Sequence, residues 1–331
     1  MKKIKKVFGL MNSYKVFGCE IAFFQTVGDI IKYVIYSKKI RKKSKINILF
    51  AKLFKLKDKY VQKWIANNFS SLLNQIDEKQ VKLNPSQKII WTMWLQGADK
   101  MPEIVKICNQ SVEKNRGEYQ HIILTYNNLS DYIKIPDFIF DKWKKGIISN
   151  ANFSDYIRIS VLDEYGGIWL DATVLLNKPL LYKSIEDYPQ YHAKGINSFS
   201  NDFLYFEIHN WQGYFLSRFG KSKMYLFLRK AFEMYWKDYN KEIDYLLINH
   251  LAYLARSKSK TLRAEYDSIP LNNFAVEEMY LLLSEPIIDV RYQNIINSRT
   301  TSIFKLNHRH KFNSTKDSQE TVYAYFKRIY K

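Results

Sequence analysis

The chain has 331 residues and a formal net charge of +20, and aromatic side chains make up 16% of it. This aromatic content allows a large buried core and excludes a chain that is disordered over most of its length. The charge is uneven, because residues 1–70 hold 17 Lys and Arg against 3 Asp and Glu, whereas the rest hold 35 against 29. Since the basic residues gather at the N-terminus, we expect no nucleic-acid surface on the body of the protein.

The first predicted elements are two basic amphipathic helices. Ile21–Tyr36 carries an apolar stripe at helical spacing, but this segment is too short and too charged to span a membrane. A second stripe runs from Leu49 to Ile65, and lysines lie between its apolar positions: Lys52, Lys55, Lys59 and Lys63.

Two interpretations of this basic region stay open. It is either a helical subdomain that packs on the body with its lysines in solvent, or a cationic surface that lies on an anionic membrane leaflet. Each basic residue near such a leaflet contributes about 1 kcal/mol. We assign residues 1–84 to this region, and residues 85–331 to a separate globular domain.

The start of the chain and its cysteines indicate the compartment. The basic residues that open the chain are not followed by the apolar core and small-residue cleavage site of a signal peptide. Cys19 and Cys108 are far apart and follow no metal-binding spacing, so we expect two free thiols in a reducing compartment. We therefore expect a cytoplasmic protein, attached peripherally to the inner face of the cell membrane.

Strands and helices alternate after residue 85, which is typical of a mixed α/β sheet with crossover helices. The expected strands and helices are, in chain order, Lys88–Leu95, Pro102–Asn115, Tyr119–Thr125 and Pro136–Lys145. Ligands of such Rossmann-type sheets bind at the carboxyl ends of the strands. This places Trp94–Gly97 and Asp171–Thr173 at candidate ligand-facing positions.

The most informative segment is Asn152–Asn177, which predicts a helix, a glycine turn and a buried strand. Asn152 or Ser154 is expected to cap the helix. Gly166 and Gly167 predict a sharp turn, and the apolar run Ile168–Leu176 predicts one central strand. A carboxylate in such a run is costly to bury without a cation or strong donors, so Asp171 is the first functional candidate.

Three charged residues of this segment form a candidate constellation. Asp155 and Arg158 lie on one helix face, and the glycine turn brings them toward Asp171. Arginine suits phosphate or sugar hydroxyls, and a carboxylate at a strand end suits a divalent ion that bridges phosphates. Since the chain has no phosphate-binding glycine fingerprint, kinase and dehydrogenase functions are disfavoured. The set points to a nucleoside diphosphate ligand.

The remainder of the chain is less informative. Met224–Tyr239 and Ile243–Ala255 have helical periodicity, and Ser302–Lys311 is a short apolar run that ends in basic and titratable residues.

The sequence SDYIRISVLDEYGGIWLDATV resembles the central motif of GT-A glycosyltransferases that have a DXD-containing sugar-binding region. These include mannosyltransferases and the glucosyltransferase domains of clostridial toxins. The closer resemblance is to the bacterial capsular polysaccharide synthesis glycosyltransferase family, whose strand typically reads W-x-D-A-T. The opening IIWTMWLQG is also similar to that family's first strand. The resemblance extends from about Pro85 to about Lys311 and implies a GT-A-like fold.

The resemblance also implies roles for individual residues. Asp155, Arg158 and Asp171 correspond to the catalytic and donor-binding core. The other residues that it implies in donor binding are Trp94, which stacks on the nucleobase, Gly167, Trp169 and His308. Asp171 corresponds to the first Asp of the DXD motif, and Thr173 takes the place of the second. The implied cofactor is a divalent metal ion, Mn²⁺ or Mg²⁺, held by Asp171 and Thr173 and partly through water.

The function implied is a retaining hexosyltransferase that uses a nucleotide sugar, with a UDP-sugar as the expected donor. The expected acceptor is a lipid-linked oligosaccharide of capsule or surface polysaccharide synthesis, which the basic N-terminus favours. Two alternatives stay open. One is an effector glycosyltransferase that modifies a protein. The other is a catalytically degenerate protein that binds a membrane surface.

Overall fold

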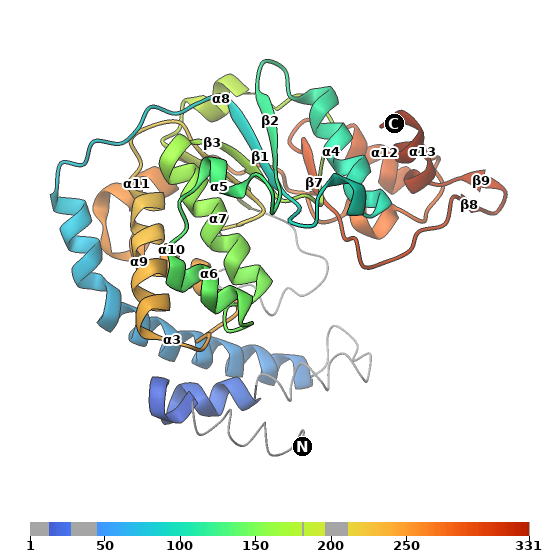
Figure 1. The fold of residues 1–331 in the computed structure, drawn as a ribbon. Helices are drawn as coiled ribbons and strands as arrows, with labels where there is room; N and C mark the ends of the chain where they lie inside the picture. The colour runs from blue at the N-terminus through green and yellow to red at the C-terminus, as the bar shows by residue number, and fades with distance from the viewer. Residues whose placement is uncertain (1–12, 28–44, 181, 196–210, 331) are drawn as a thin grey trace.

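The computed structural model describes residues 13–27, 45–180, 182–195 and 211–330. A five-stranded sheet in the order β2-β1-β3-β6-β5 forms its centre, and helices cover it (Figure 1). The predicted mixed α/β sheet is therefore confirmed.

The sheet combines a parallel half with an antiparallel half. β1 (Ile89–Met93) pairs in parallel with β2 (Gln120–Leu124) and with β3 (Gly167–Leu170). β6 (Phe215–Arg218) runs antiparallel to both β3 and β5 (Gln190–His192). All four residues of β3 are buried, as its apolar sequence predicts for a strand covered on both faces.

The helices that position the site follow the predicted pattern. They are α4 (Glu103–Asn115), α6 (Asp137–Lys144), α7 (Asn150–Tyr165), α9 (Met224–Asp238) and α10 (Leu247–Lys258). The predicted start of the last helix at Ile243 is wrong. Asp244 accepts the backbone N–H of Leu246 at 2.8 Å and so forms a turn before the helix begins.

The cap of α7 also differs from the prediction. Ser149 is the N-cap, and its hydroxyl accepts the backbone N–H of Asn152. Asn152 and Ser154 therefore lie inside the helix and do not cap it, so the helix begins one turn earlier than its polar residues indicate.

The predicted central strand Ile168–Leu176 is in fact two strands. β3 ends at Leu170, and the backbone N–H of Val174 donates to the carbonyl of Asp171 at 2.8 Å, which closes a turn. The chain then enters β4 (Val174–Leu176), which pairs antiparallel with β7 (Ile303–Lys305) in a separate two-stranded sheet. A continuous apolar run did not reveal this change of sheet, because both strands are buried.

The long basic helix α3 (Lys45–Glu78) packs against α9 and α10, beneath which it lies in Figure 1. One stripe of the helix joins the largest buried apolar cluster, and its members are Val61, Ile65, Phe69, Leu73 and Ile76. The opposite stripe is exposed and carries the four lysines of the predicted basic face. The first predicted helix is described only up to residue 27, where residues 19–27 are helical, and the boundary at residues 84 and 85 stays a prediction.

The rest of the described chain completes the layers around the sheets. The other helices and strands are α5 (Leu129–Tyr132), α8 (Tyr182–Glu186), α11 (Lys260–Ser268), α12 (Val290–Ile296), α13 (Val322–Ile329), β8 (Thr315–Lys316) and β9 (Gln319–Glu320).

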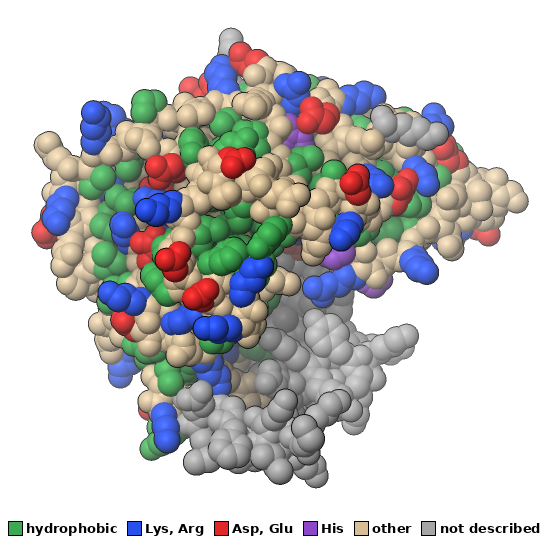
Figure 2. Space-filling model, in the orientation of Figure 1, with side chains coloured by type: hydrophobic (Ala, Val, Ile, Leu, Met, Phe, Trp, Pro, Cys, Tyr) green, Lys and Arg blue, Asp and Glu red, His purple; other side chains and the backbone are tan. Residues whose placement is uncertain are grey.

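Within the described ranges, no helix has the length and apolar character needed to cross a membrane. Both cysteines are free thiols, as predicted, with Cys19 exposed and Cys108 buried. On the face seen in Figure 2, basic and acidic side chains are interspersed over the body.

Candidate active site

The candidate site lies at the edge of the sheet where β1 and β3 end. These strands are parallel, with Trp91 opposite Trp169, so their carboxyl ends reach the same edge. Asp171 follows β3 directly, and Trp94 follows β1. Both predicted ligand-facing positions are therefore at one edge of the sheet.

A two-glycine turn follows α7 and directs β3 back along the helix. Gly166 and Gly167 have φ angles of +67° and +82°, a region that favours glycine. A Cβ atom on Gly167 would also lie 2.4 Å from the carbonyl oxygen of Ile89, which is closer than real contacts allow. This glycine lets β3 approach β1, and the turn sets the first half of α7 beside Asp171.

The Asp171 carboxylate is the centre of the site, because three side chains from different elements converge on it. Its Oδ1 atom lies 3.2 Å from Nη2 of Arg158 and accepts the indole N–H of Trp169 at 2.9 Å. Its Oδ2 atom accepts Nζ of Lys305 at 2.7 Å. The negative charge of Asp171 at the end of β3 is therefore balanced by one cation from α7 and another from β7.

Arg158 is held in place by further contacts. Its Nη1 atom donates to the carbonyl of Gly213 at 2.6 Å and lies 3.4 Å from Asp155. The guanidinium also lies 5.4 Å from the ring centre of Trp169, in a cation–π contact. The buried Nε atom has no hydrogen-bond partner among the described residues. Arg158 therefore keeps one unused donor beside Asp171.

Lys305 is the charged member of the site that the sequence did not predict. The pairing of β4 with β7 sets Lys305 opposite Val174, and its ammonium contacts both Asp171 and the hydroxyl of Thr173, the latter at 2.9 Å. The sequence signal for Lys305 was its place within the short apolar run Ser302–Lys311, whose other basic residues follow it.

Burial and charge set the pKa values of the two acids in opposite directions. Burial acts to raise the pKa of Asp171, but Arg158 and Lys305 outweigh it and hold that pKa well below its usual range. Burial raises the pKa of Asp155 to about 6. The charge of Asp171 also raises this pKa, whereas the charge of Arg158 lowers it. Asp171 therefore stays ionised at all physiological pH values, whereas Asp155 gains a proton in mildly acidic solution.

A cavity of about 410 Å³ opens onto these charges. Asp155, Arg158, Asp171 and Lys305 line it together with residues from two other segments. Those residues are Gln212, Gly213 and Tyr214, which directly precede β6, and Tyr245, Leu246, Ile248 and Asn249 around the start of α10. None of these seven residues was predicted, because they come from parts of the chain without a recognisable motif.

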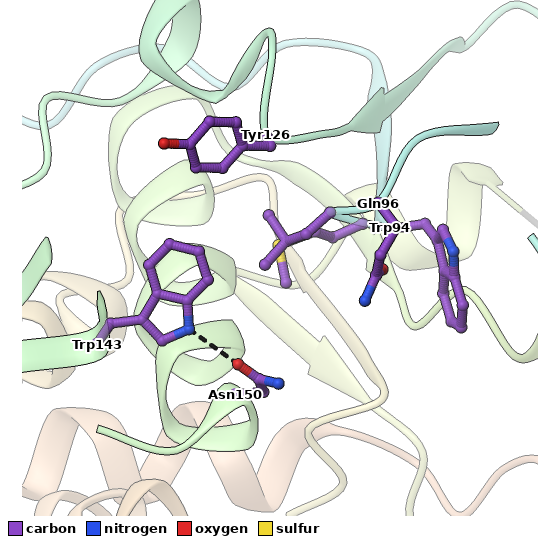
Figure 3. Close-up of a pocket in the computed structure, with 7 residues that line it drawn as sticks. Trp94, Gln96, Tyr126, Trp143 and Asn150 are labelled. Atoms are coloured by element: carbon purple, nitrogen blue, oxygen red, sulfur yellow. Dashed lines mark hydrogen bonds between the residues drawn. The ribbon is translucent and has the colours of Figure 1, made fainter. Parts of the chain in front are cut away.

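A second cavity of about 390 Å³ lies next to the first along α7, because Asn150 lines this one and Ala151 lines the other. Three of its seven lining residues are aromatic. Figure 3 shows Tyr126 and Trp143 on one side, with Trp94 and Gln96 across from them. The indole N–H of Trp143 donates to Asn150 at 2.9 Å. Aromatic faces with amide groups between them are suited to a planar or ring-shaped polar ligand.

Four of the predicted donor-binding residues line a cavity, and two others contact a residue that does. Asp155, Arg158 and Asp171 line the charged cavity, and Trp94 lines the aromatic one. Trp169 is buried beneath Arg158, where it contacts Asp171 without lining either cavity. His308 meets the ring of Trp94 edge-on, with 5.4 Å between ring centres.

Gly167 is the predicted residue that the structure keeps apart from the others. It lies at the amino end of β3, at the opposite end of the strand from Asp171. Its position is explained by the close approach to Ile89, and it lines neither cavity.

The residues at the predicted metal site do not fit a divalent ion. The carboxylate of Asp171 and the hydroxyl of Thr173 both accept hydrogen bonds from the Lys305 ammonium, which lies where an ion bridging them would have to be. Within the described ranges, no group of three or more His, Cys, Asp or Glu side chains could hold a metal ion. Mg²⁺ and Mn²⁺ favour carboxylate oxygens, and here a single carboxylate is already neutralised by two cations.

Comparison with known proteins gives one match. A family model described as capsular polysaccharide synthesis protein matches residues 40–326. The match contains every residue of both cavities, and it also contains all of α3, whereas the motif resemblance began only at about Pro85. No curated protein and no solved structure matches the chain.

Proposed function

The chain belongs to the capsular polysaccharide synthesis protein family, and from that premise we propose that it is a nucleotide-sugar-dependent glycosyltransferase. It moves a hexosyl group from a donor such as a UDP-sugar to a hydroxyl of a lipid-linked intermediate in capsule or surface polysaccharide synthesis. The observation that carries this proposal is the pair of cations, Arg158 and Lys305, that meet on Asp171 beside a cavity of about 410 Å³.

Two cations at one cavity suit a leaving group that gains negative charge. When a nucleotide sugar reacts, charge develops on the phosphate oxygen that leaves the sugar, and fixed cations stabilise it. Asp171 holds Arg158 and Lys305 close together, and its single negative charge cancels only one of theirs. Asp155 offsets the other charge where it is ionised, above its pKa of about 6. Arg158 lines this cavity, which gives its guanidinium access to that diphosphate.

The aromatic cavity supports a place for the nucleobase. Trp94 lies at the end of β1 and faces Tyr126 and Trp143 across a cavity of about 390 Å³. A base that stacks on these rings would direct its diphosphate along the start of α7 toward Arg158. In this arrangement the sugar lies in the charged cavity, near Asp155 and Tyr245.

The proposed reaction proceeds with retention of configuration. The acceptor hydroxyl oxygen bonds to the anomeric carbon on the face from which the diphosphate leaves. The bond from that carbon to the phosphate oxygen breaks, and its electron pair stays on the diphosphate. The proton of the acceptor hydroxyl passes to the same diphosphate oxygen. Arg158 and Lys305 stabilise the charge on that oxygen, and Asp171 keeps both cations in position.

The exposed face of α3 supports a membrane-bound acceptor. Its four lysines lie on the side of the helix opposite to the apolar stripe that packs on α9 and α10. A stripe of cations of this kind is attracted to anionic lipid headgroups. We propose that this face holds the enzyme at the inner surface of the cell membrane, where a lipid-linked acceptor is located.

A thermal-shift comparison of nucleoside diphosphates with nucleosides tests the proposal. UDP, GDP, ADP and CDP are each added to the full chain, beside uridine, guanosine, adenosine and cytidine. A ligand at about one hundred times its Kd stabilises the native state by about 2.7 kcal/mol. We expect one diphosphate to raise the melting temperature by several degrees and its nucleoside to have a much smaller effect.

The Arg158→Gln variant identifies the site of binding. Arg263→Gln serves as its control, because Arg263 is exposed and forms an ion pair with Asp267 one turn further along the same helix. We expect the diphosphate shift to be lost in the first variant and kept in the second. An equal shift in both variants, or no shift of the wild type with any diphosphate, would contradict the proposed function.

A further inference from the structure

We propose that Lys305 supplies the positive charge that a divalent metal ion supplies at DXD sites, so that this chain binds and activates its donor without a metal. The inference rests on the proposed function, because it concerns the cation that faces the donor diphosphate. It starts from one geometric fact. The Lys305 ammonium lies 2.7 Å from Asp171 Oδ2 and 2.9 Å from Thr173 Oγ1, between the two positions of the motif.

The replacement of the second Asp by Thr173 fits this role. Two carboxylates would attract a divalent ion, whereas one carboxylate and one hydroxyl match a single positive charge with several donors. The ammonium donates to both oxygens of this pair. Its position is further restricted by the ring of Tyr214, whose centre lies 5.5 Å from Nζ. Thr173 and Lys305 therefore act as one unit across the paired strands β4 and β7.

Lys305 also has the access and the spare capacity that a ligand needs. An ammonium has three N–H donors, and among the described residues Asp171 and Thr173 take two of them. The side chain lines the charged cavity, and 27% of its surface is exposed. The third donor is therefore available to a phosphate oxygen in that cavity, without loss of the bond to Asp171.

The reaction needs no further component under this assignment. As the bond between the anomeric carbon and the phosphate oxygen breaks, the electron pair stays on the diphosphate, and Lys305 and Arg158 stabilise it. The acceptor proton passes to the same diphosphate oxygen. Removal of one such stabilising donor from an enzyme typically lowers the rate by about 100- to 1,000-fold.

The first test uses the wild-type chain and compares two buffers, one with EDTA and one with Mn²⁺. We expect the Kd of the best-binding diphosphate among UDP, GDP, ADP and CDP to change by less than about threefold, which is well under 1 kcal/mol. We also expect electron paramagnetic resonance to detect no stoichiometric Mn²⁺ site in the protein alone. Binding that requires Mn²⁺ would overturn the role of Lys305 and leave the proposed function intact. No binding in either buffer would overturn both.

The second test exchanges the two kinds of cation. Lys305→Met removes the charge and keeps the length of the side chain, and we expect it to lower donor turnover by about 100-fold or more. Lys106→Met is the matched control, because Lys106 is an exposed lysine on α4. The double variant with Thr173→Asp and Lys305→Met restores two carboxylates. We expect it to gain an Mn²⁺ signal and an Mn²⁺-dependent affinity for the diphosphate. Lys305→Met with unchanged turnover would refute the proposal.

Discussion

Two buried charge clusters in this protein have nearly the same composition and different surroundings. One is the candidate site, with Asp155, Asp171, Arg158 and Lys305. The other lies between α3 and α10, where the Lys57 ammonium pairs with Asp244 at 2.5 Å and with Asp58 at 3.5 Å, and His250 lies 3.8 Å from Asp244. We call the first the site cluster and the second the α3 cluster.

Electrostatics alone do not distinguish the two clusters. In the α3 cluster, burial raises the pKa of Asp58 to about 6, against the effect of Lys57. Burial also acts to raise the pKa of Asp244, but Lys57 and His250 outweigh it and lower that pKa to about 2. The site cluster has the same pattern, with one acid raised and one lowered. Perturbed pKa values therefore mark buried charge networks and not function by themselves.

Access to a cavity is what separates them. The side chains of Asp171 and Lys305 are 23% and 27% exposed and line a cavity. The side chains of Asp244 and His250 are 9% and 0% exposed, and no member of the α3 cluster lines either cavity. We infer that the α3 cluster fastens the basic helix to the body, whereas the site cluster keeps donors available for a ligand.

Equivalent substitutions in the two clusters should give opposite phenotypes, and this is the largest predicted effect. Asp171→Asn releases the anchor of Arg158 and Lys305, so we expect donor turnover to fall by about 100- to 1,000-fold. Asp244→Asn leaves the buried Lys57 with only a weaker partner, so we expect about 3 kcal/mol lower unfolding free energy and unchanged diphosphate affinity. Turnover measures the first effect, and urea unfolding measures the second.

The control for these substitutions is Asp267→Asn, which breaks an exposed pair with Arg263. It should cost less than about 1 kcal/mol and leave turnover unchanged. If Asp244→Asn lowered turnover as strongly as Asp171→Asn in folded protein, the division between a structural and a functional cluster would be wrong.

The two faces of α3 give the next comparison. The exposed lysines are replaced by glutamine at Lys52, Lys55, Lys59 and Lys63. Because each of the four cations contributes about 1 kcal/mol near an anionic surface, we expect binding to phosphatidylserine vesicles to weaken by about 1,000-fold. Diphosphate affinity should not change, since these side chains lie away from both cavities. Vesicle sedimentation at low salt measures the change.

A control with the same loss of charge separates the α3 face from net charge. It replaces exposed lysines of the body at Lys106, Lys134, Lys221 and Lys260. Equal weakening by both sets, or equal binding of the wild type to neutral vesicles, would show that no specific membrane face exists on α3.

The site cluster was partly predictable, because three of its four members are close together in sequence. Asp155, Arg158 and Asp171 lie within one helix, one turn and one strand, and helical spacing with two glycines was enough to bring them together. The fold class was predictable for a similar reason, since the alternation of strands and helices is read from neighbouring residues.

The fourth member of the site cluster depends on pairing between distant segments. Lys305 is 134 residues from Asp171, and only the register of β4 on β7 brings them together. Register between distant buried strands leaves no local signal, because both sequences are simply apolar. The break between β3 and β4 was hidden for the same reason. The α3 cluster was also missed, because Lys57 and Asp58 look like ordinary members of a solvated helix face.

The smallest predicted effect concerns the pH dependence of stability that arises from Asp58. Its pKa is about 6 in the folded chain against an ordinary value of 3.8, so the folded state binds this proton more tightly than the unfolded state does. The contribution of Asp58 to stability is therefore fully present below about pH 4 and is lost as the pH rises to about 6.

Asp58→Asn cannot ionise, and its unfolding free energy relative to the wild type should rise by about 1–2 kcal/mol over this range. Urea unfolding at a series of pH values measures this difference, with the exposed Asp131→Asn as the control that should show none. A parallel pH dependence of the Asp58→Asn variant and the wild type would mean that Asp58 is solvated in the folded protein. In that case the α3 cluster would not be the closed counterpart of the site cluster.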